Sequence, residues 1–434
     1  MHKLRPQLIV LSLLASLIPS AGCSAELETG VKAESSTTQI IAKDDGGYQL
    51  THNGAPYTIL GVGGNTELEL LKSYGGNTIR TWGADDIGPL MDQAAELDIA
   101  VVVGIWLEHE RKGFDYSDPQ SKAGELEKVT EAVNRYKDHP ALLAWGVGNE
   151  VELGGSMDTA IMQINDAAAI IKSLDPNHPT MAVIAEIGDD KAIRIQNECP
   201  QIDMLGINSY GGLASLSKRL ENQGVTKPYA ITEFGPVGHW ETGNTPWGAP
   251  YEQSSADKAS FLEKNYTQTI EPNIGKQCLG SFAFLWGHKQ ERTATWYGLL
   301  LESGETTQSV DVLNRLWTGE TVDNAAPIVS KLLMEANHYS IAAGQVLEIS
   351  VEASDPDGDE LTTAWELLKE STAQSMGGDF ESQVDQVSVH IEPIDATTAK
   401  ITAPSTPGAY RIFATVRDGR GHAGTVNLPI MVVE

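Results

Sequence analysis

The sequence alternates between short apolar runs and longer segments of helical periodicity, and about 270 residues hold eight such pairs, the size of a (β/α)8 barrel. The apolar runs are nearly continuous, which is typical of parallel strands covered by helices. We therefore predict an α/β fold with a (β/α)8 TIM barrel at residues 47–319. Its strands are predicted at 56–64, 77–82, 100–106, 142–148, 180–185, 204–209, 229–233 and 280–286. Its helices are predicted at 66–74, 87–97, 122–136, 157–174, 190–196, 213–222, 255–269 and 310–317.

The pattern changes after the barrel. Residues 320–326 are expected to be a linker, and residues 327–434 carry short alternating runs separated by Gly, Pro and Asp clusters. This pattern predicts a small all-β sandwich of immunoglobulin-like type, with Trp365 in its core. We expect this domain to fold separately and to contribute no catalytic group.

One turn of the predicted sandwich is strongly acidic. The run from Asp355 to Glu360 resembles a turn of cadherin-like and PKD-like domains. Its carboxylates at Asp355, Asp357 and Asp359 fit either calcium ligands or a solvated acidic turn. No Cys/His cluster has the spacing of a zinc site, and we predict no metal or cofactor.

The N-terminus has the pattern of an export signal. Lys3 and Arg5 precede an apolar run at 8–18, and Ser20-Ala21-Gly22-Cys23 resembles a bacterial lipobox. We predict a lipoprotein signal peptide at residues 1–22, lipid attachment at Cys23 and a flexible tether at 23–46. The protein is then expected on the outer membrane of a bacterial cell envelope. The alternative is ordinary cleavage and a freely secreted protein.

The net charge limits the partners. The formal charge of −29 argues against nucleic acid and other polyanions, and a neutral polymer fits better. No run after the signal reaches about 18 apolar residues, so no transmembrane helix is expected. The sequence leaves the oligomeric state open, as well as the pairing of Cys199 with Cys278.

Two predicted strands end in a carboxylate. Asn149-Glu150 follows the fourth strand, and Glu233 ends the seventh. The carboxyl ends of the strands meet at one face of such a barrel, where a pair of carboxyl groups is the apparatus for cleaving a glycosidic bond. A single Asn-Glu pair also occurs at a helix N-terminus, so the prediction depends on both acids and on the eightfold repeat.

These positions resemble clan A of the glycoside hydrolases, which are retaining enzymes on this fold. The resemblance covers residues 48–319 and implies that Glu150 is the acid/base and Glu233 the nucleophile. It also implies that Asn149 binds the sugar 2-hydroxyl, and that Arg80 and Tyr210 contact the nucleophile. Trp286 would be the platform on which a sugar ring stacks.

The supporting residues have simpler interpretations as well. Arg80 fits a structural ion pair, and Tyr210 and Trp286 fit plain packing. Several further side chains fall at or just after strand ends, and of these we take Trp106 and Trp240 as substrate-binding candidates. The others, which fit loop packing equally well, are Trp82, Glu108, His109 and His239.

Three motifs indicate the family within the clan. Residues 207–210 (INSY), 232–235 (TEFG) and 296–299 (WYGL) resemble the β-1,3-glucanosyltransferases of family 72 and the β-1,3-glucanases of family 17. Residues 137–146 are similar to the barrel domain of family 2. The resemblance implies a retaining β-glycoside hydrolase or transglycosylase acting on a β-glucan polysaccharide or oligosaccharide, β-1,3-linked. The alternatives are a β-1,4-glucanase or mannanase, and a non-catalytic surface glycan-binding lipoprotein built on a barrel that has lost its activity.

Overall fold

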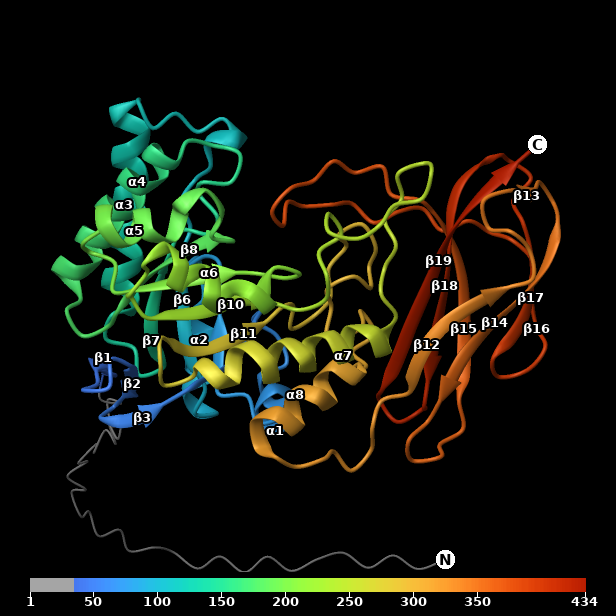
Figure 1. The fold of residues 1–434 in the computed structure, drawn as a ribbon, viewed down its shortest axis with the longest axis horizontal. Helices are drawn as coiled ribbons and strands as arrows, with labels where there is room; N and C mark the ends of the chain where they lie inside the picture. The colour runs from blue at the N-terminus through green and yellow to red at the C-terminus, as the bar shows by residue number, and fades with distance from the viewer. Residues whose placement is uncertain (1–34) are drawn as a thin grey trace, which may run out of the picture. The chain divides into compact units, whose positions relative to one another are not determined.

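A computed structural model describes residues 35–434, so the predicted signal peptide and Cys23 lie outside the described residues. Eight parallel strands close into a barrel in the order β10-β11-β4-β5-β6-β7-β8-β9 (Figure 1). Each strand is followed by a helix on the outside, and the barrel is followed by two mainly antiparallel sheets. The predicted fold class is confirmed.

The elements of the barrel domain lie close to their predicted positions. Its strands are β4 (Ile59–Gly63), β5 (Thr78–Arg80), β6 (Ala100–Ile105), β7 (Leu142–Val147), β8 (Thr180–Ala185), β9 (Met204–Asn208), β10 (Tyr229–Phe234) and β11 (Cys278–Ala283). Its helices are α1 (Leu68–Ser73), α2 (Gly88–Glu96), α3 (Pro119–Tyr136), α4 (Met157–Leu174), α5 (Lys191–Glu198), α6 (Leu216–Gln223), α7 (Ser255–Asn265) and α8 (Gln308–Thr318).

The segment predicted as a tether is partly a strand. β1 (Thr38–Ala42) pairs antiparallel with β2 (Tyr48–His52), which pairs in turn with β3 (Ala55–Tyr57) through a turn at Asn53-Gly54. Ile40 packs against an apolar cluster of the barrel domain that includes Leu50 and Ile59. The Ser- and Thr-rich composition concealed this strand, although its partner β2 follows after only a short turn at residues 43–47.

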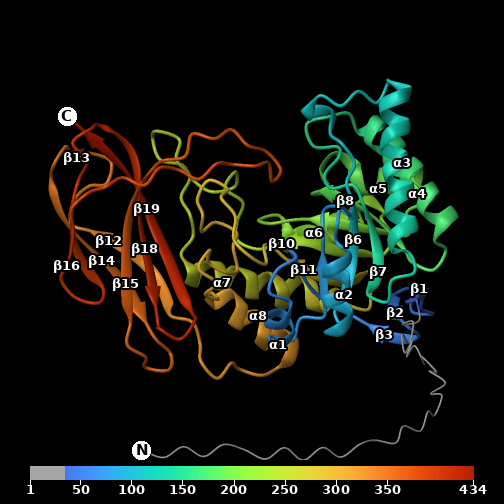
Figure 2. The same cartoon turned by 180° about the vertical axis from the view of Figure 1, so that it is seen from behind.

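The C-terminal domain is a sandwich of two four-stranded sheets, with orders β12-β14-β17-β16 and β13-β19-β18-β15 (Figure 2). The strands are β12 (Ile328–Met334), β13 (Ile341–Ala342), β14 (Val346–Ser354), β15 (Thr362–Lys369), β16 (Ile391–Pro393), β17 (Thr398–Thr402), β18 (Gly408–Arg417) and β19 (Ala423–Val433). Trp365 lies in the core between the sheets, as predicted.

Polar contacts join the sandwich to the barrel domain. Arg411 on β18 is 1% exposed and forms an ion pair of 2.8 Å with Glu370, while its Nη2 donates to the carbonyl of Pro250. Ser255 at the start of α7 accepts a 2.7 Å hydrogen bond from the backbone of Thr425 on β19. The two domains therefore share a buried interface, which the expectation of separate folding did not include.

Both cysteines of the folded region are free and buried. Burial raises the pKa of the Cys199 and Cys278 thiols to about 12, so both stay protonated at neutral pH. None of the helices over residues 35–434 has the length and apolar content needed to span a bilayer.

Candidate active site

Glu150 leaves the end of β7 on a strained backbone. Gly148 and Glu150 both have positive φ angles, of 70° and 52°, which is uncommon for a residue with a side chain. The backbone N–H of Glu150 donates to the carbonyl of Val183 on the neighbouring strand β8, at 2.9 Å. This contact holds the strained residue in place, and strained residues held by their surroundings cluster at functional sites.

Glu233 on β10 accepts hydrogen bonds from three side chains. Arg80 Nη1 lies 3.0 Å and Trp82 Nε1 3.1 Å from its Oε1, and the hydroxyl of Tyr210 lies 2.9 Å from its Oε2. The carboxylate is 6% exposed. A guanidinium and two further donors on one buried carboxylate fix its orientation.

A second set of contacts links the strand ends. Arg80 Nη2 donates a 2.6 Å hydrogen bond to Oδ1 of Asn149, so one guanidinium holds both Asn149 and Glu233. Asn208, at the end of β9, donates at 2.9 Å to Oε1 of Glu150. The structure therefore brings together Arg80, Asn149, Glu150, Tyr210 and Glu233, five of the residues that the sequence assigned to the site.

The pKa of Glu150 is raised above its ordinary value. Burial is the largest cause, the negative charge of Glu233 adds to it, and the hydrogen bond from Asn208 opposes it. A carboxyl group that keeps its proton near neutral pH is suited to donate that proton to a leaving group. The two carboxyl groups thus occupy contrasting surroundings, because Arg80 touches Glu233 and not Glu150.

The carboxyl groups open into a cavity of about 1020 Å³. Both predicted binding tryptophans line it, with Trp106 37% and Trp240 57% exposed. Trp82 and Phe284 add two further aromatic side chains. Flat apolar surfaces of this kind pack against the C–H faces of sugar rings.

Trp286, the predicted sugar platform, does not line this cavity. It is 2% exposed and belongs to the core between strands and helices. After β11 ends at Ala283, Phe284 and Leu285 face the cavity, and the backbone of Trp286 returns to pair with Gly63 on β4. The prediction for Trp286 is wrong because strand alternation is lost where the chain leaves the sheet.

Trp82, Asn208 and His239 also line the cavity, although none of them was predicted to bind substrate. Asn208 lies within the INSY motif and Trp82 two residues after Arg80, so strand-end position was the available signal for both. His239 lies 3.7 Å from Glu291, and burial lowers the pKa of His239 to about 4 while raising that of Glu291. Glu108 and His109 do not line the cavity.

The lysines of the cavity are neutralised by carboxylates. Lys112 lies 2.9 Å from Asp379, Lys191 3.1 Å from Glu152 and Lys289 2.7 Å from Glu291. Asp379 belongs to the C-terminal domain, and five residues of the same loop, 374–378, line the cavity. The cavity therefore has walls from both domains.

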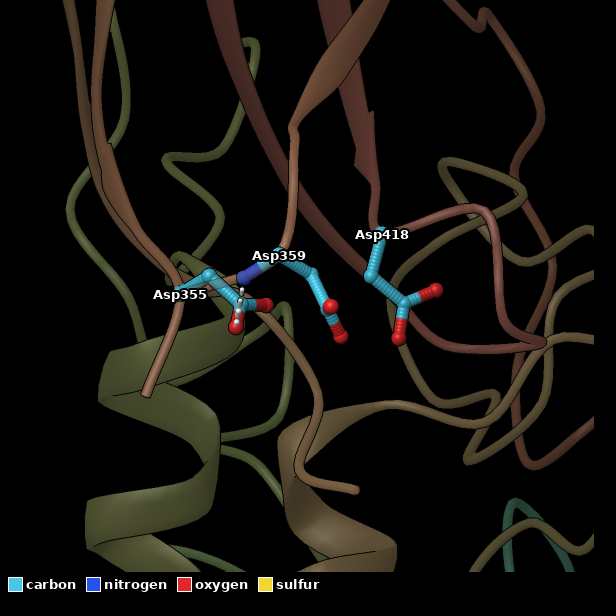
Figure 3. Close-up of side chains that lie close together, drawn as sticks. All are labelled: Asp355, Asp359 and Asp418. Carbon is cyan, nitrogen blue, oxygen red and sulfur yellow. Dashed lines mark hydrogen bonds between the residues drawn. The ribbon is translucent and has the colours of Figure 1, made fainter. Parts of the chain in front are cut away.

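Two aspartates of the acidic turn in the C-terminal domain form a cluster of carboxylates with Asp418, and none of the three lines the cavity. Figure 3 shows the side chains of Asp355, Asp359 and Asp418 beside one another. One carboxylate oxygen from each lies within 4.8 Å of those of the other two. Asp357 is not part of it, since its carboxylate accepts from the backbone of Ala325. Arg420 lies 2.8 Å from Asp359, so one of the three charges is already paired.

Residues 90–272 match the family described as "Glycosyl hydrolases family 2, TIM barrel domain". This segment begins in α2, ends after α7 and includes Glu150 and Glu233. A stretch of 51 residues is 49% identical to mannan endo-1,4-beta-mannosidase F of Aspergillus clavatus, covering 12% of each chain. A similar stretch is 45% identical to the probable enzyme of that name from Aspergillus oryzae, covering 12% of this chain and 11% of the relative.

Two solved structures share the fold. The β-glucuronidase of Bacteroides uniformis has a TM-score of 0.51 at 13% identity, covering 91% of this chain and 48% of that protein. The β-glucuronidase of Faecalibacterium prausnitzii has a TM-score of 0.51 at 17% identity, covering 65% of this chain and 52% of that protein. The chain thus spans about half the length of these two proteins. The candidate site lies in a TIM barrel similar to the barrel domain of family 2 glycoside hydrolases.

Proposed function

We propose that this protein is a retaining glycosidase that acts on a neutral β-linked glycan, with β-1,3-glucan as the first candidate. The observation that carries the proposal is the contrast between two buried carboxyl groups at the same barrel face. Glu233 is held by Arg80, Trp82 and Tyr210, while Glu150 has a raised pKa. This is the pairing of nucleophile and acid that a double displacement requires.

The reaction has two steps. Glu233 attacks the anomeric carbon as Glu150 gives its proton to the departing oxygen, which forms a covalent glycosyl-enzyme and releases the leaving sugar. Glu150, now a carboxylate, removes a proton from an incoming hydroxyl that displaces Glu233. Water as the acceptor gives hydrolysis, and a sugar hydroxyl gives transfer.

A neutral substrate is favoured by charge. The three lysines of the cavity already have carboxylate partners, and Arg80 is engaged by Glu233 and Asn149. The formal charge of −29 adds a repulsive field for anionic polymers. None of these four side chains is left unpaired for a uronic acid; Arg292, which also lines the cavity, donates to the carbonyl of Ala373.

The choice of a β-1,3 linkage is based on sequence motifs. The INSY, TEFG and WYGL motifs resemble β-1,3-glucan-active families, and this supports β-1,3-glucan. The second candidate is β-1,4-mannan, favoured by the 51-residue similarity to the mannosidases of Aspergillus. A non-catalytic glycan-binding protein is the rival from another class, and it gives no reason for the opposite surroundings of Glu150 and Glu233.

A substrate panel tests the proposal. The purified protein is incubated with β-1,3-, β-1,4- and mixed-linkage glucans and with β-1,4-mannan, and the released sugars are separated and identified. We expect products from β-1,3-glucan with the parent protein and none with the Glu233→Gln variant. Products from mannan alone would replace glucan by the second candidate. Binding without any product would support the glycan-binding protein instead.

We also propose that the protein is attached to a bacterial outer membrane through lipid on Cys23. The support is the lipobox-like run of the sequence and the Ser24 that follows it. Attachment would place the barrel where extracellular polysaccharide arrives, and free secretion is the alternative.

A further inference from the structure

A long loop of the C-terminal domain reaches the candidate active site. Residues 370–390 connect β15 to β16 and extend well beyond the two sheets (Figure 1). The loop begins at Glu370, which is anchored by the buried Arg411. Its segment 374–378 lines the same cavity as Glu150 and Glu233.

The loop is bound to two different sides of the barrel mouth. On the side of β6, Asp379 forms a bidentate ion pair with Arg111, with N–O distances of 2.6 and 3.1 Å, and an ion pair of 2.9 Å with Lys112. On the side of β11, Lys289 donates to the carbonyl of Gly378 at 3.0 Å, and the backbone N–H of Arg292 donates to Glu381 at 2.8 Å.

These two anchors lie far apart around the barrel. β6 and β11 are three positions apart in the ring of eight strands, with β4 and β5 between them. A loop that is fixed on both sides spans the mouth, and its buried carboxylate at Glu381 and paired Asp379 keep it there. The loop is therefore a fixed wall of the cavity.

The loop touches Glu150 at a glycine. A Cβ atom added to Gly377 would lie 3.0 Å from Oε2 of Glu150 and 2.6 Å from Cδ2 of Leu153, so these side chains would have to shift to admit it. The φ angle of Gly377 is also positive, at 57°. Because Asn208 holds Oε1, the Glu150 carboxyl group lies between a barrel amide and this loop.

The position of Glu150 indicates which part of the substrate the loop would contact. The proton donor of a glycosidase stands beside the oxygen of the leaving group, on the side away from the sugar that becomes bonded to the enzyme. Gly377 is next to that donor, so the neighbouring Gln374 and Met376 face the space for the leaving sugar. Met376 is 51% exposed and Gln374 offers an amide, the combination of apolar surface and hydrogen bonding that suits a sugar.

We propose that residues 374–378 form part of the binding site for the leaving, or acceptor, portion of the glycan, with Gln374 and Met376 as its specificity-determining side chains. Trp106 adds to this site from the barrel, because Lys112 connects Trp106 with the loop. The Nζ of Lys112 lies 5.4 Å from the centre of the Trp106 ring and 2.9 Å from Asp379 of the loop. The inference rests on the proposed glycosidase function and adds the C-terminal domain to it.

The test compares a substrate that has a sugar as its leaving group with one that does not. One is a β-1,3-gluco-oligosaccharide of six units, and the other is the β-fluoride of the disaccharide, whose leaving group is a fluoride ion and fills no sugar site. The value of kcat/KM reports the first step for both. In the double variant Gln374→Ala/Met376→Ala, we expect kcat/KM to fall about tenfold or more for the oligosaccharide and less than about twofold for the fluoride.

Met162→Ala is the matched control, since Met162 is 42% exposed on the outer helix α4 and does not line the cavity. It should leave both rates unchanged. Equal loss on both substrates, or no loss on the oligosaccharide, would overturn the proposed role of the loop. A parent protein that cleaves neither substrate nor any glycan of the panel would overturn the glycosidase function itself, and the inference with it.

Discussion

Asn208 Nδ2 donates a 2.9 Å hydrogen bond to Oε1 of Glu150. The other end of the same amide, Oδ1, accepts a 2.7 Å hydrogen bond from the hydroxyl of Thr232. Thr232 directly precedes Glu233, so one side chain on β9 connects the positions of both carboxyl groups. The Thr232 hydroxyl also fixes which way the amide faces, because it leaves the NH₂ group to donate to Glu150.

This bond predicts a pH effect. The donor from Asn208 stabilises the ionised form of Glu150 and so opposes the rise in its pKa. In Asn208→Ala that opposition is lost, and the pKa of Glu150 rises further. Glu150 acts while protonated, so the alkaline limb of the kcat/KM–pH profile should move to higher pH. An unmoved limb in a folded variant would contradict this role.

Arg80 is predicted to be essential for the nucleophile. Arg80→Met removes the charge that faces Glu233 and the donor to Asn149, and kcat should fall by about 10²–10³-fold. Because Arg80 is 1% exposed, the free energy of unfolding should also fall by about 3–5 kcal/mol, which a denaturation curve measures.

Arg194→Met provides the comparison for Arg80. Arg194 sits on the outer helix α5, where it pairs with Asp158 and Glu198, and both kcat and stability should stay close to the parent values. Equal kinetic effects of the two substitutions would remove Arg80 from the site.

The roles of the two glutamates predict opposite responses to azide. Glu233→Ala should be inactive on every substrate and should regain turnover with azide, giving an α-glycosyl azide. Glu150→Ala should keep turnover of substrates with good leaving groups and give a β-glycosyl azide. Proton NMR of the first product of the parent enzyme completes the assignment. A first-formed α-anomer would mean inversion and would exclude Glu233 as the nucleophile.

The domain interface predicts that the barrel alone is unstable. Arg411→Met leaves Glu370 buried without its partner and should lower the free energy of unfolding by about 3–5 kcal/mol. The control Arg420→Met breaks an ion pair at an exposed arginine and should cost about 1 kcal/mol or less. A chain truncated after Thr318 that matched the parent in thermal unfolding and in oligosaccharide cleavage would contradict the interface and the loop.

Membrane attachment is tested by fractionation. Cells that express Cys23→Ala should release the protein from the membrane fraction, because the acylated residue is absent. Ser24→Ala retains the cysteine and should stay membrane-attached. A Cys23→Ala variant that remains in the membrane fraction like the parent would show that the lipobox-like run is not the anchor.

The sequence by itself determined the barrel and the positions of Glu150 and Glu233. Strand and helix periods are local properties, so the eight units could be counted without knowing their contacts. Parallel strands then bring their carboxyl ends to one face, and the resemblance to clan A, which shares this fold, implied that Arg80, Asn149 and Tyr210 lie beside the two acids.

Tertiary structure alone decided what lies beyond the strand ends. Trp286 lies in the core because the chain leaves β11 irregularly, and β1 is held by the packing of Ile40 on the barrel as well as by its pairing with the adjacent β2. The loop 370–390 has no period of its own, and its contact with Glu150 joins residues more than 200 positions apart in the sequence. Local patterns fix elements, whereas a wall built by a second domain depends on packing between elements distant in the chain.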